Sequence, residues 1–208
     1  MQTRTNTPVA RSLQAFTLIE LLTVIAIIGI LAAIIIPTVG SVKISANKAK
    51  SKAQFSQWSV SMGLFKNEYG YYPSIGTGNK VVAASFFGAL TGKSYSGGTA
   101  SDLKGNSKKL SFYSASDSEV TLIANGDAAD GLLKDAFGNT DIVYFVDSNS
   151  DGIINDQDSP ALSLAPVTPI DGAPVTPTGF TAAAGVRSGV IFYSAGRGLT
   201  ANDIVYSW

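Results

Sequence analysis

The chain has 208 residues, 15 basic and 15 acidic side chains, and neither histidine nor cysteine. Its length allows one domain, or one domain with an extension. The missing residue types exclude disulfide bonds, thiolate or histidine-ligated metal sites and a Ser-His-Asp triad, and the balanced charge argues against a protein that binds nucleic acid by neutralising phosphates. Only 14% of the residues are charged, which is low and indicates that part of the chain does not face water.

An apolar segment covers residues 16–36, and Glu20 is its only charged side chain. As a helix it would be about 30 Å long, the thickness of a bilayer's hydrocarbon core. The alternative is a cleavable secretory signal, because Arg4 and Arg11 precede the segment. The apolar part of a signal is shorter, about 7–15 residues, so the sequence favours a retained membrane helix. Lysines on the far side of the segment leave its orientation undecided by charge.

The same helix is predicted to continue to about residue 70. Apolar side chains recur at spacings of three and four, as on one helical face: Phe55, Trp58, Met62, Phe65 and Tyr69. A second set fills a neighbouring strip: Ala46, Ala49, Ala53, Val60 and Leu64. Gly70 suits a helix end, and Pro73 prevents continuation. Pro37 is expected to kink the helix, because proline removes a backbone hydrogen bond.

The remainder of the chain is predicted to form a small antiparallel sheet with long loops. A short helix is expected over residues 81–90. Strands rich in β-branched and aromatic residues are expected over residues 141–146, 189–194 and 203–208. The sequence APVTP occurs at residues 165–169 and again at 173–177, which we interpret as an extended surface loop. The predicted fold class is therefore α+β, with a long N-terminal helix whose C-terminal half packs on the sheet.

Glu20 is a carboxylate within an apolar helix, where a charge is costly unless it is neutralised. If the chain were cut between Ala15 and Phe16, the new amine would lie four residues away on the same helical face. That amine could pair with Glu20 of the same chain or of a neighbouring subunit. The alternative is a carboxylate that reaches the membrane interface from the helix end.

Residues 11–22, with the sequence RSLQA-FTLIELL, resemble the leader and processing site of type IV pilins and type II secretion pseudopilins. The resemblance implies cleavage after Ala15 by a prepilin peptidase and N-methylation of Phe16. It also implies that Glu20 meets a neighbour's amine during assembly, and that Pro37 is the proline at which the family's helix bends or loosens. Ala15 stands where the family usually has glycine.

The resemblance divides the chain into a leader (1–15), a membrane and filament-core helix (16–42), an amphipathic half of the helix (43–70) and a β-rich head (71–208). It implies a homo-oligomeric helical filament, the prepilin peptidase and methyltransferase as partners, and an assembly platform in the inner membrane. The precursor would cross the bacterial inner membrane once, with its head outside the cytoplasm. No nucleic acid is required.

Residues 147–158 have the spacing of a calcium-binding loop. Oxygen-bearing groups fall at positions one, three, five, seven, nine and twelve, the seventh being a backbone carbonyl, and glycine at position six allows the sharp turn. The six expected ligands are Asp147, Asn149, Asp151, Ile153, Asn155 and Asp158. The alternative is an acidic turn without an ion. Major pseudopilins, which residues 67–73, 134–139 and 202–208 resemble more loosely, typically carry calcium and lack the pilin disulfide.

We find no catalytic constellation. Ser194 and Ser207 have no candidate base at motif spacing, and residues 196–198 do not form the glycine pattern of a phosphate loop. The expected function is therefore a structural subunit of a type II secretion pseudopilus, and not an enzyme. The alternatives are a type IV pilin for adhesion, motility or DNA uptake, and a membrane-tethered calcium-binding module that does not polymerise.

Overall fold

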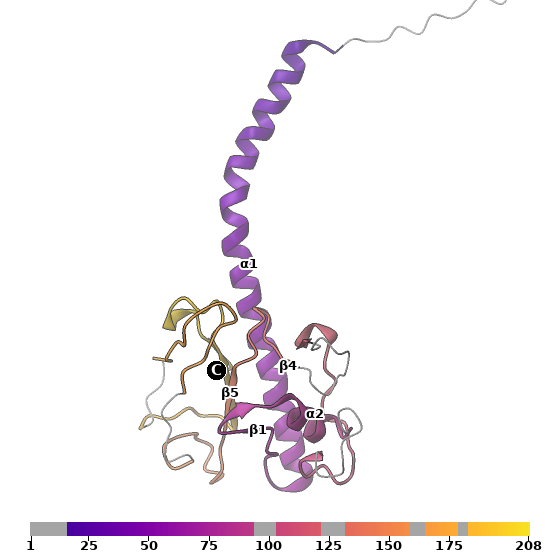
Figure 1. Ribbon diagram of the computed structural model, residues 1–208, viewed down its shortest axis with the longest axis vertical. Helices are drawn as coiled ribbons and strands as arrows, with labels where there is room; N and C mark the ends of the chain where they lie inside the picture. The colour runs from indigo at the N-terminus through magenta and orange to yellow at the C-terminus, as the bar shows by residue number, and fades with distance from the viewer. Residues whose placement is uncertain (1–15, 94–102, 122–131, 159–164, 179–182) are drawn as a thin grey trace, which may run out of the picture. The chain divides into compact units, whose positions relative to one another are not determined.

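The computed structural model describes residues 16–93, 103–121, 132–158, 165–178 and 183–208 (Figure 1). The chain forms two compact units, Met1–Lys43 and Ile44–Trp208. A long helix and a small antiparallel sheet confirm the α+β class. The predicted leader, including Ala15, lies outside the described residues.

Helix α1 runs from Leu18 to Tyr69. At its end Gly70 takes the left-handed conformation, with φ of 83°, and its N–H donates to the carbonyl of Lys66 at 2.7 Å. A side chain would be strained at this φ, so Gly70 ends the helix as predicted. The helix assignment continues through Pro37, and the predicted kink stays a prediction.

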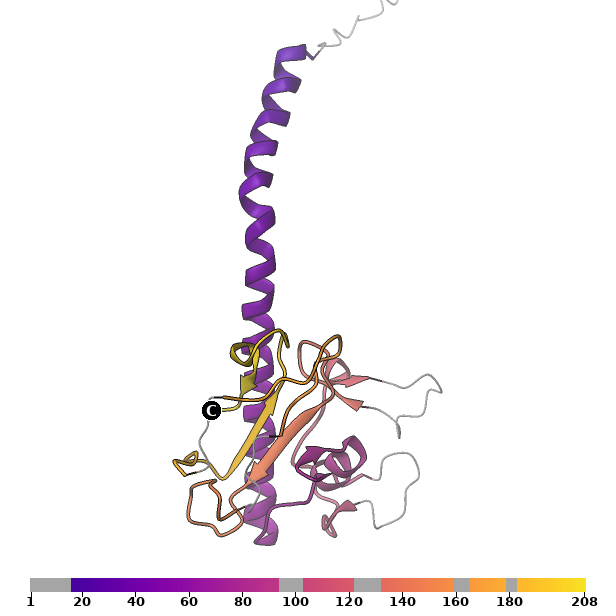
Figure 2. The ribbon, with the colours of Figure 1, turned by 60° about the vertical axis from the view of Figure 1, so that its left-hand side comes forward.

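The main sheet has the strand order β1-β2-β5-β6-β7, and all its pairs are antiparallel. Figure 2 shows β5 and β6 side by side as the two long strands, paired from Ile142 with Ser194 to Val146 with Val190. The strand bounds are β1 Gly76–Thr77, β2 Lys80–Val81, β5 Ile142–Val146, β6 Val190–Ser194 and β7 Val205–Tyr206. A second sheet pairs β3, Val120–Thr121, with β4, Leu132–Leu133.

Two predicted elements had wrong boundaries. Helix α2 spans Ala83–Thr91, because Val81 belongs to β2 of a hairpin that the sequence reading missed. Gly78 and Asn79 both have positive φ at the turn of this hairpin, as a tight two-residue turn requires. The strand expected over residues 203–208 is shorter, since Ala201–Asp203 forms a 3-10 turn before β7. Another 3-10 turn, Asp117–Glu119, precedes β3.

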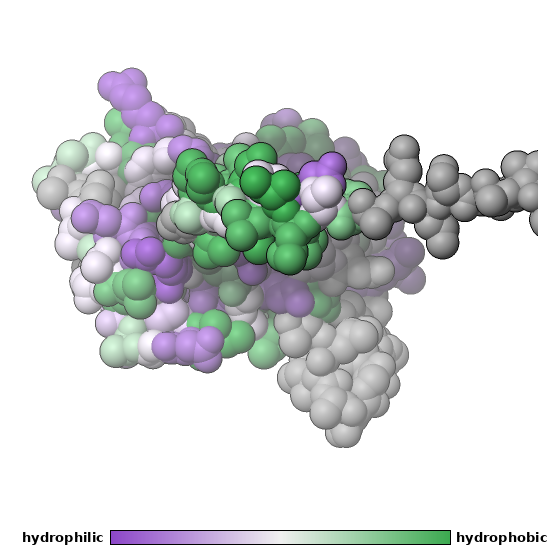
Figure 3. Space-filling model, turned by 90° about the horizontal axis from the view of Figure 1, so that it is seen from above, coloured by the Kyte–Doolittle hydropathy of each residue, from purple (hydrophilic) through white to green (hydrophobic). Residues whose placement is uncertain are grey.

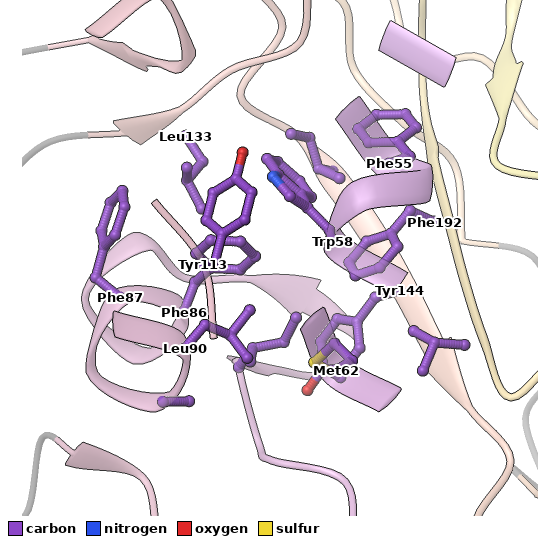
Figure 4. Close-up of a cluster of buried hydrophobic side chains, with 14 of the residues drawn as sticks. Phe55, Trp58, Met62, Phe86, Phe87, Leu90, Tyr113, Leu133, Tyr144 and Phe192 are labelled. Atoms are coloured by element: carbon purple, nitrogen blue, oxygen red, sulfur yellow. The ribbon is translucent and has the colours of Figure 1, made fainter. Parts of the chain in front are cut away.

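The first core cluster lies between α1, α2 and one face of the main sheet (Figure 4). Four residues of the predicted aromatic stripe, Phe55, Trp58, Met62 and Phe65, are completely buried. The Trp58 ring lies 4.8 Å from Phe86 of α2 and 5.5 Å from Phe192 of β6, centroid to centroid. The stripe therefore fixes the C-terminal half of α1 onto the sheet.

The opposite face of the sheet is covered by long loops. Successive residues of β5 alternate between the two core clusters, so that Val143 and Phe145 pack away from α1. The two APVTP segments pair with each other here: Val167 and Val175 exchange backbone hydrogen bonds of 3.0 and 2.9 Å. Val167 is completely buried against the sheet. The loop lies at the surface as predicted, since most of its residues are exposed, and Val167 in addition helps to close the second core.

Candidate functional site

The first turn of α1 is closed by a reciprocal pair between Thr17 and Glu20. The Thr17 backbone N–H and hydroxyl both donate to Glu20 Oε2, at 2.8 and 2.7 Å. The Glu20 N–H donates to Thr17 Oγ1 at 3.3 Å. This is a capping box, which satisfies N–H groups that a helix start leaves without partners. We did not predict this capping box, although a threonine three residues before a glutamate is its sequence signature.

The capping box uses a single oxygen of the Glu20 carboxylate. Among the described residues, Oε1 accepts no hydrogen bond. A carboxylate can accept at both oxygens, so an ammonium group can bind at Oε1 while Thr17 stays bound at Oε2. The geometry is therefore compatible with a charge partner for Glu20 from a second chain.

Beyond the first turn, the apolar side chains of α1 are uncovered. The large apolar residues between Leu18 and Ile36 are exposed, and Figure 3 shows such side chains gathered around the end of the helix. In the described part of the chain, α1 is the one helix long and apolar enough to cross a membrane. Exposed apolar surface of this extent requires a lipid or protein environment.

Around Pro37, hydroxyl side chains bind carbonyls of the preceding turn. Thr38 Oγ1 donates to the Ile35 carbonyl at 2.8 Å, and Ser41 Oγ donates to the Thr38 carbonyl at 2.9 Å. Proline cannot donate a backbone hydrogen bond. The carbonyl that lacks its usual donor is that of Ala33, four residues before Pro37, and these two hydroxyls bind other carbonyls, so they do not replace the missing bond.

The loop at residues 147–158 follows β5 directly and is closed on itself by hydrogen bonds. Asp147 accepts the N–H groups of Asp151 and Gly152 at 3.2 and 3.0 Å. Asp158, at the last position, accepts the N–H groups of Ser148 at 2.8 Å and Asn155 at 2.9 Å. Gly152 has φ of 85°, so glycine is needed at position six. The turn expected from the spacing is therefore present.

The remaining predicted ligands also accept backbone N–H groups within the loop. Asn149 Oδ1 accepts from Asp151 N–H at 2.9 Å, Asp151 Oδ1 from Ile153 N–H at 2.8 Å, and Asn155 Oδ1 from Gln157 N–H at 2.8 Å. Partial burial acts to raise the pKa of Asp158, but backbone donors prevail and hold it below its ordinary value. The loop thus favours the ionised form of Asp158.

The donor set fits calcium, which prefers carboxylate, amide and carbonyl oxygens. In the described ranges, however, no group of three or more acidic side chains is placed to hold a metal ion. The carboxylates of Asp147 and Asp158 are engaged by N–H groups. Calcium binding would have to draw these side chains together in competition with those bonds.

The loop is anchored to the end of α1. Lys66 Nζ donates to Ser150 Oγ at 3.0 Å and lies 4.3 Å from the centre of the Tyr72 ring. Burial and the nearby Asp147 carboxylate raise the pKa of the Tyr72 hydroxyl. A movement of Ser150 in the loop would therefore change the contacts of Lys66 at the end of α1.

A buried polar network, missed by the sequence reading, centres on Asp135. Its side chain is 2% exposed and accepts hydrogen bonds from Asn139 N–H at 2.8 Å, Asn139 Nδ2 at 2.9 Å and Ser194 Oγ at 2.6 Å. Asn139 Nδ2 also donates to the Gly196 carbonyl at 2.6 Å. Burial raises the pKa of Asp135, although these donors oppose the rise. The network joins residues 134–139 to the end of β6 and has a structural role.

Comparison with known families matches residues 11–36 to the prokaryotic N-terminal methylation motif. Comparison with curated proteins and with solved structures finds no match. The matched residues include Ala15, Phe16 and Glu20, and Pro37 directly follows them. The chain thus carries the N-terminal methylation motif that is characteristic of type IV pilins and pseudopilins, as the resemblance of its N-terminal residues predicted.

Proposed function

We propose that the chain is a structural subunit of a helical filament, made as a membrane precursor and assembled through its N-terminal helix. The observation that carries this proposal is the methylation motif at residues 11–36, which leads directly into an uncovered apolar helix. Its presence implies processing by a prepilin peptidase. The motif and helix fit a protein anchored in the inner membrane, and we infer a single crossing with the head outside the cytoplasm.

Assembly requires the apolar part of α1 to leave lipid and enter protein. Each large apolar side chain contributes about 1.5–3 kcal/mol when it is removed from water, so the helix cannot be left in water during transfer. Packing against equivalent helices offsets the loss of lipid contacts. In the proposed mechanism, cleavage creates the Phe16 amine, methylation modifies it, and Oε1 of a neighbour's Glu20 binds its positive charge.

Within the family, we propose a pseudopilin of the type II secretion system. The absence of cysteine excludes the disulfide of pilins, and residues 134–139 and 202–208 resemble segments of major pseudopilins. Assembly platform proteins of the inner membrane would be its partners. A type IV pilus subunit is the alternative, because both classes share the N-terminal motif.

We further propose that residues 147–158 bind Ca²⁺. The six ligands are Asp147, Asn149, Asp151, the carbonyl of Ile153, Asn155 and Asp158. The spacing of oxygen groups and the left-handed Gly152 support this proposal. A protein that bound calcium but never polymerised would instead be a membrane-tethered calcium-binding module, which is the second alternative function.

Recovery of filaments tests the structural role. Cells that make the full chain together with a prepilin peptidase and an assembly platform should release filaments on shearing, visible by electron microscopy and containing this chain. Ala15→Leu places a large residue at the cleavage position, so that variant should accumulate as precursor without filaments. Processed wild-type chain that remains wholly in the membrane would contradict the proposal.

A further inference from the structure

Within the unit Ile44–Trp208, the first turns of α1 border a pocket outside the sites described above. Its volume of about 340 Å³ lies in the range of pockets that hold small ligands, about 300–1,000 Å³. One wall is α1, and most of the other is the C-terminal segment, residues 201–208, drawn in yellow in Figure 2. We call it the lysine pocket. Its polar and aromatic lining residues are Lys48, Lys52, Thr178, Asn202, Tyr206 and Trp208.

Two ammonium groups are held at this pocket by main-chain oxygens of the opposite wall. Lys48 Nζ donates to the Asn202 carbonyl at 3.3 Å, and Lys52 Nζ donates to the main-chain oxygen of Trp208 at 2.9 Å. An ammonium group has three N–H donors, and each of these bonds uses one of them. Lys48 and Lys52 are four residues apart and lie on one side of α1. Their remaining donors can therefore contribute to one anion site.

The lining of the lysine pocket favours a negative ligand. In the described part of the chain, no acidic side chain lines it. Asp203, which follows Asn202, pairs instead with Arg197, with 3.3 Å between Oδ1 and Nε. Thr178 and Asn202 are exposed and add neutral side-chain donors. Positive charge combined with several hydrogen-bond donors is the chemistry that binds a phosphate group.

The lysine pocket is also close in sequence to the predicted membrane segment. After Glu20 come 22 uncharged residues, 21–42, which as a helix are about 33 Å long and match the hydrocarbon core of a bilayer. Lys48 follows Val42 by six residues, about 9 Å further along a helix. Each headgroup region is about 5–7 Å thick, and lysine side chains extend toward it. Lys48 is therefore within reach of lipid headgroups.

Two aromatic rings distinguish a lipid from a soluble phosphate as the occupant. The ring centroids of Tyr206 and Trp208 lie 4.6 Å apart, and both residues are partly buried. Tyrosine and tryptophan are enriched where a membrane meets water, because their rings contact the apolar part of a lipid while their polar ends stay hydrated. A free phosphate ion would leave these rings without a contact, whereas a lipid glycerol would cover them.

We propose that the lysine pocket binds the phosphate group of an anionic phospholipid, such as phosphatidylglycerol, in the membrane that α1 crosses. Lys48 and Lys52 bind the phosphate oxygens, and the rings of Tyr206 and Trp208 contact the glycerol. A zwitterionic lipid binds less well, because its amine would lie near two lysines with no acid to pair with. The bound lipid holds the head at the membrane surface before assembly. The inference rests on the proposed membrane anchoring and not on the filament.

Tryptophan fluorescence of the full chain in maltoside micelles tests the ligand. The chain has two tryptophans, and Trp58 is completely buried, so a ligand in the lysine pocket should change the emission of Trp208. Dihexanoylphosphatidylglycerol should give a saturable change that is absent in Trp208→Phe. Dihexanoylphosphatidylcholine and inorganic phosphate should each bind at least about fivefold more weakly. Equal binding of either one would overturn the proposal.

Three neighbouring lysines provide matched variants for this titration. Lys48→Gln and Lys52→Gln should each weaken binding of the anionic lipid about fivefold, the contribution of one lysine near an anionic membrane surface. Lys50→Gln removes the same charge between them, but Lys50 lies outside the pocket, 3.5 Å from Ser118 Oγ. It should bind as wild type, and all three should melt as wild type because these lysines are exposed. Equal weakening by Lys50→Gln would show a general surface attraction and refute the pocket.

Thiol labelling in proteoliposomes tests the same contact in a bilayer, because the chain has no cysteine of its own. Ala201→Cys introduces a thiol in the lysine pocket. It should react more slowly with a water-soluble maleimide when the vesicles contain phosphatidylglycerol than when they contain phosphatidylcholine alone. Ile170→Cys, at a position 68% exposed and outside the pocket, should react equally in both. Equal labelling of Ala201→Cys in both vesicles would overturn the inference.

These measurements separate the inference from the proposed function, because none of them requires polymerisation. A chain that forms filaments but shows no preference for the anionic lipid would refute the lysine pocket as a lipid site and leave the structural role intact. A chain that binds the anionic lipid as described but never forms filaments would support the lipid site and refute the proposed function.

Discussion

Glu20→Gln should leave the processed chain in the membrane and abolish filaments. Glutamine at this position retains an oxygen that can accept the two Thr17 hydrogen bonds, so the capping box stays closed. It removes the negative charge that we assign to the amine of a neighbouring Phe16. Glu20→Ala removes both the cap and the charge, and we expect the same loss of filaments. The measurement is the amount of chain in the sheared fraction relative to the membrane fraction.

Thr17→Val is the matched control for this prediction. It keeps the charge of Glu20 and removes the hydroxyl that accepts the Glu20 N–H. If the charge drives assembly, Thr17→Val should still form filaments. If Glu20→Gln assembled like wild type while Glu20→Ala and Thr17→Val failed, Glu20 would act as a helix cap and the charge-pair mechanism would be refuted.

Calcium should raise the melting temperature of the full chain in detergent micelles. At a concentration 100 times the dissociation constant, a single ligand stabilises the folded state by about 2.7 kcal/mol, which is roughly 5–10 °C for a domain of this size. Chelation should reverse the rise. The reason is that Ca²⁺ would draw together carboxylates that otherwise repel one another in the loop at residues 147–158. Differential scanning fluorimetry with calcium and with chelator measures the shift.

Two neighbouring aspartates provide a matched pair for this experiment. Asp158→Asn removes a proposed ligand and should abolish the calcium shift, whereas Asp156→Asn removes a charge outside the ligand set and should retain it. Without calcium, the low pKa of Asp158 implies stability that is present above the ordinary aspartate value of 3.8 and is lost as the pH falls further. An equal melting temperature with calcium and with chelator would refute calcium binding at residues 147–158.

Much of the fold could be predicted from periodicity. Phe55, Trp58, Met62 and Phe65 recur every three or four residues, and all four are buried against the sheet. The central strands β5 and β6 were predicted because long β-branched runs lie between turn residues. Local signals were sufficient in both cases, because the spacing of large apolar side chains showed which element they form.

Features that depend on contacts distant in the sequence were not predicted. Asp135 reads as a turn residue, yet the fold buries it beside Ser194, 59 positions further along the chain. The pairing of Val167 with Val175 was likewise not predicted, because it depends on the packing of Val167 in the second core cluster. The prediction of the processing residues rests on the motif around Phe16. The capping box of Thr17 was not predicted, because Thr17 and Glu20 lie within an otherwise apolar segment.

The alanine-rich face of α1 shows the same limit. Spacing placed Ala46, Val60 and Leu64 beside the aromatic stripe, but spacing cannot say which of two adjacent apolar faces the rest of the chain will cover. The aromatic face is buried, whereas Ala46, Val60 and Leu64 are exposed. The physical reason is size: aromatic side chains fill the space between helix and sheet, and alanines do not.

The most direct test of the account is the mass of the mature N-terminus. Mass spectrometry of the chain from membranes and from sheared material should show a first residue at Phe16 that carries one methyl group. That result would establish processing of the kind that the methylation motif implies. A chain that retains Met1 in cells with an active prepilin peptidase would contradict the central claim, because no Phe16 amine would exist to meet Glu20.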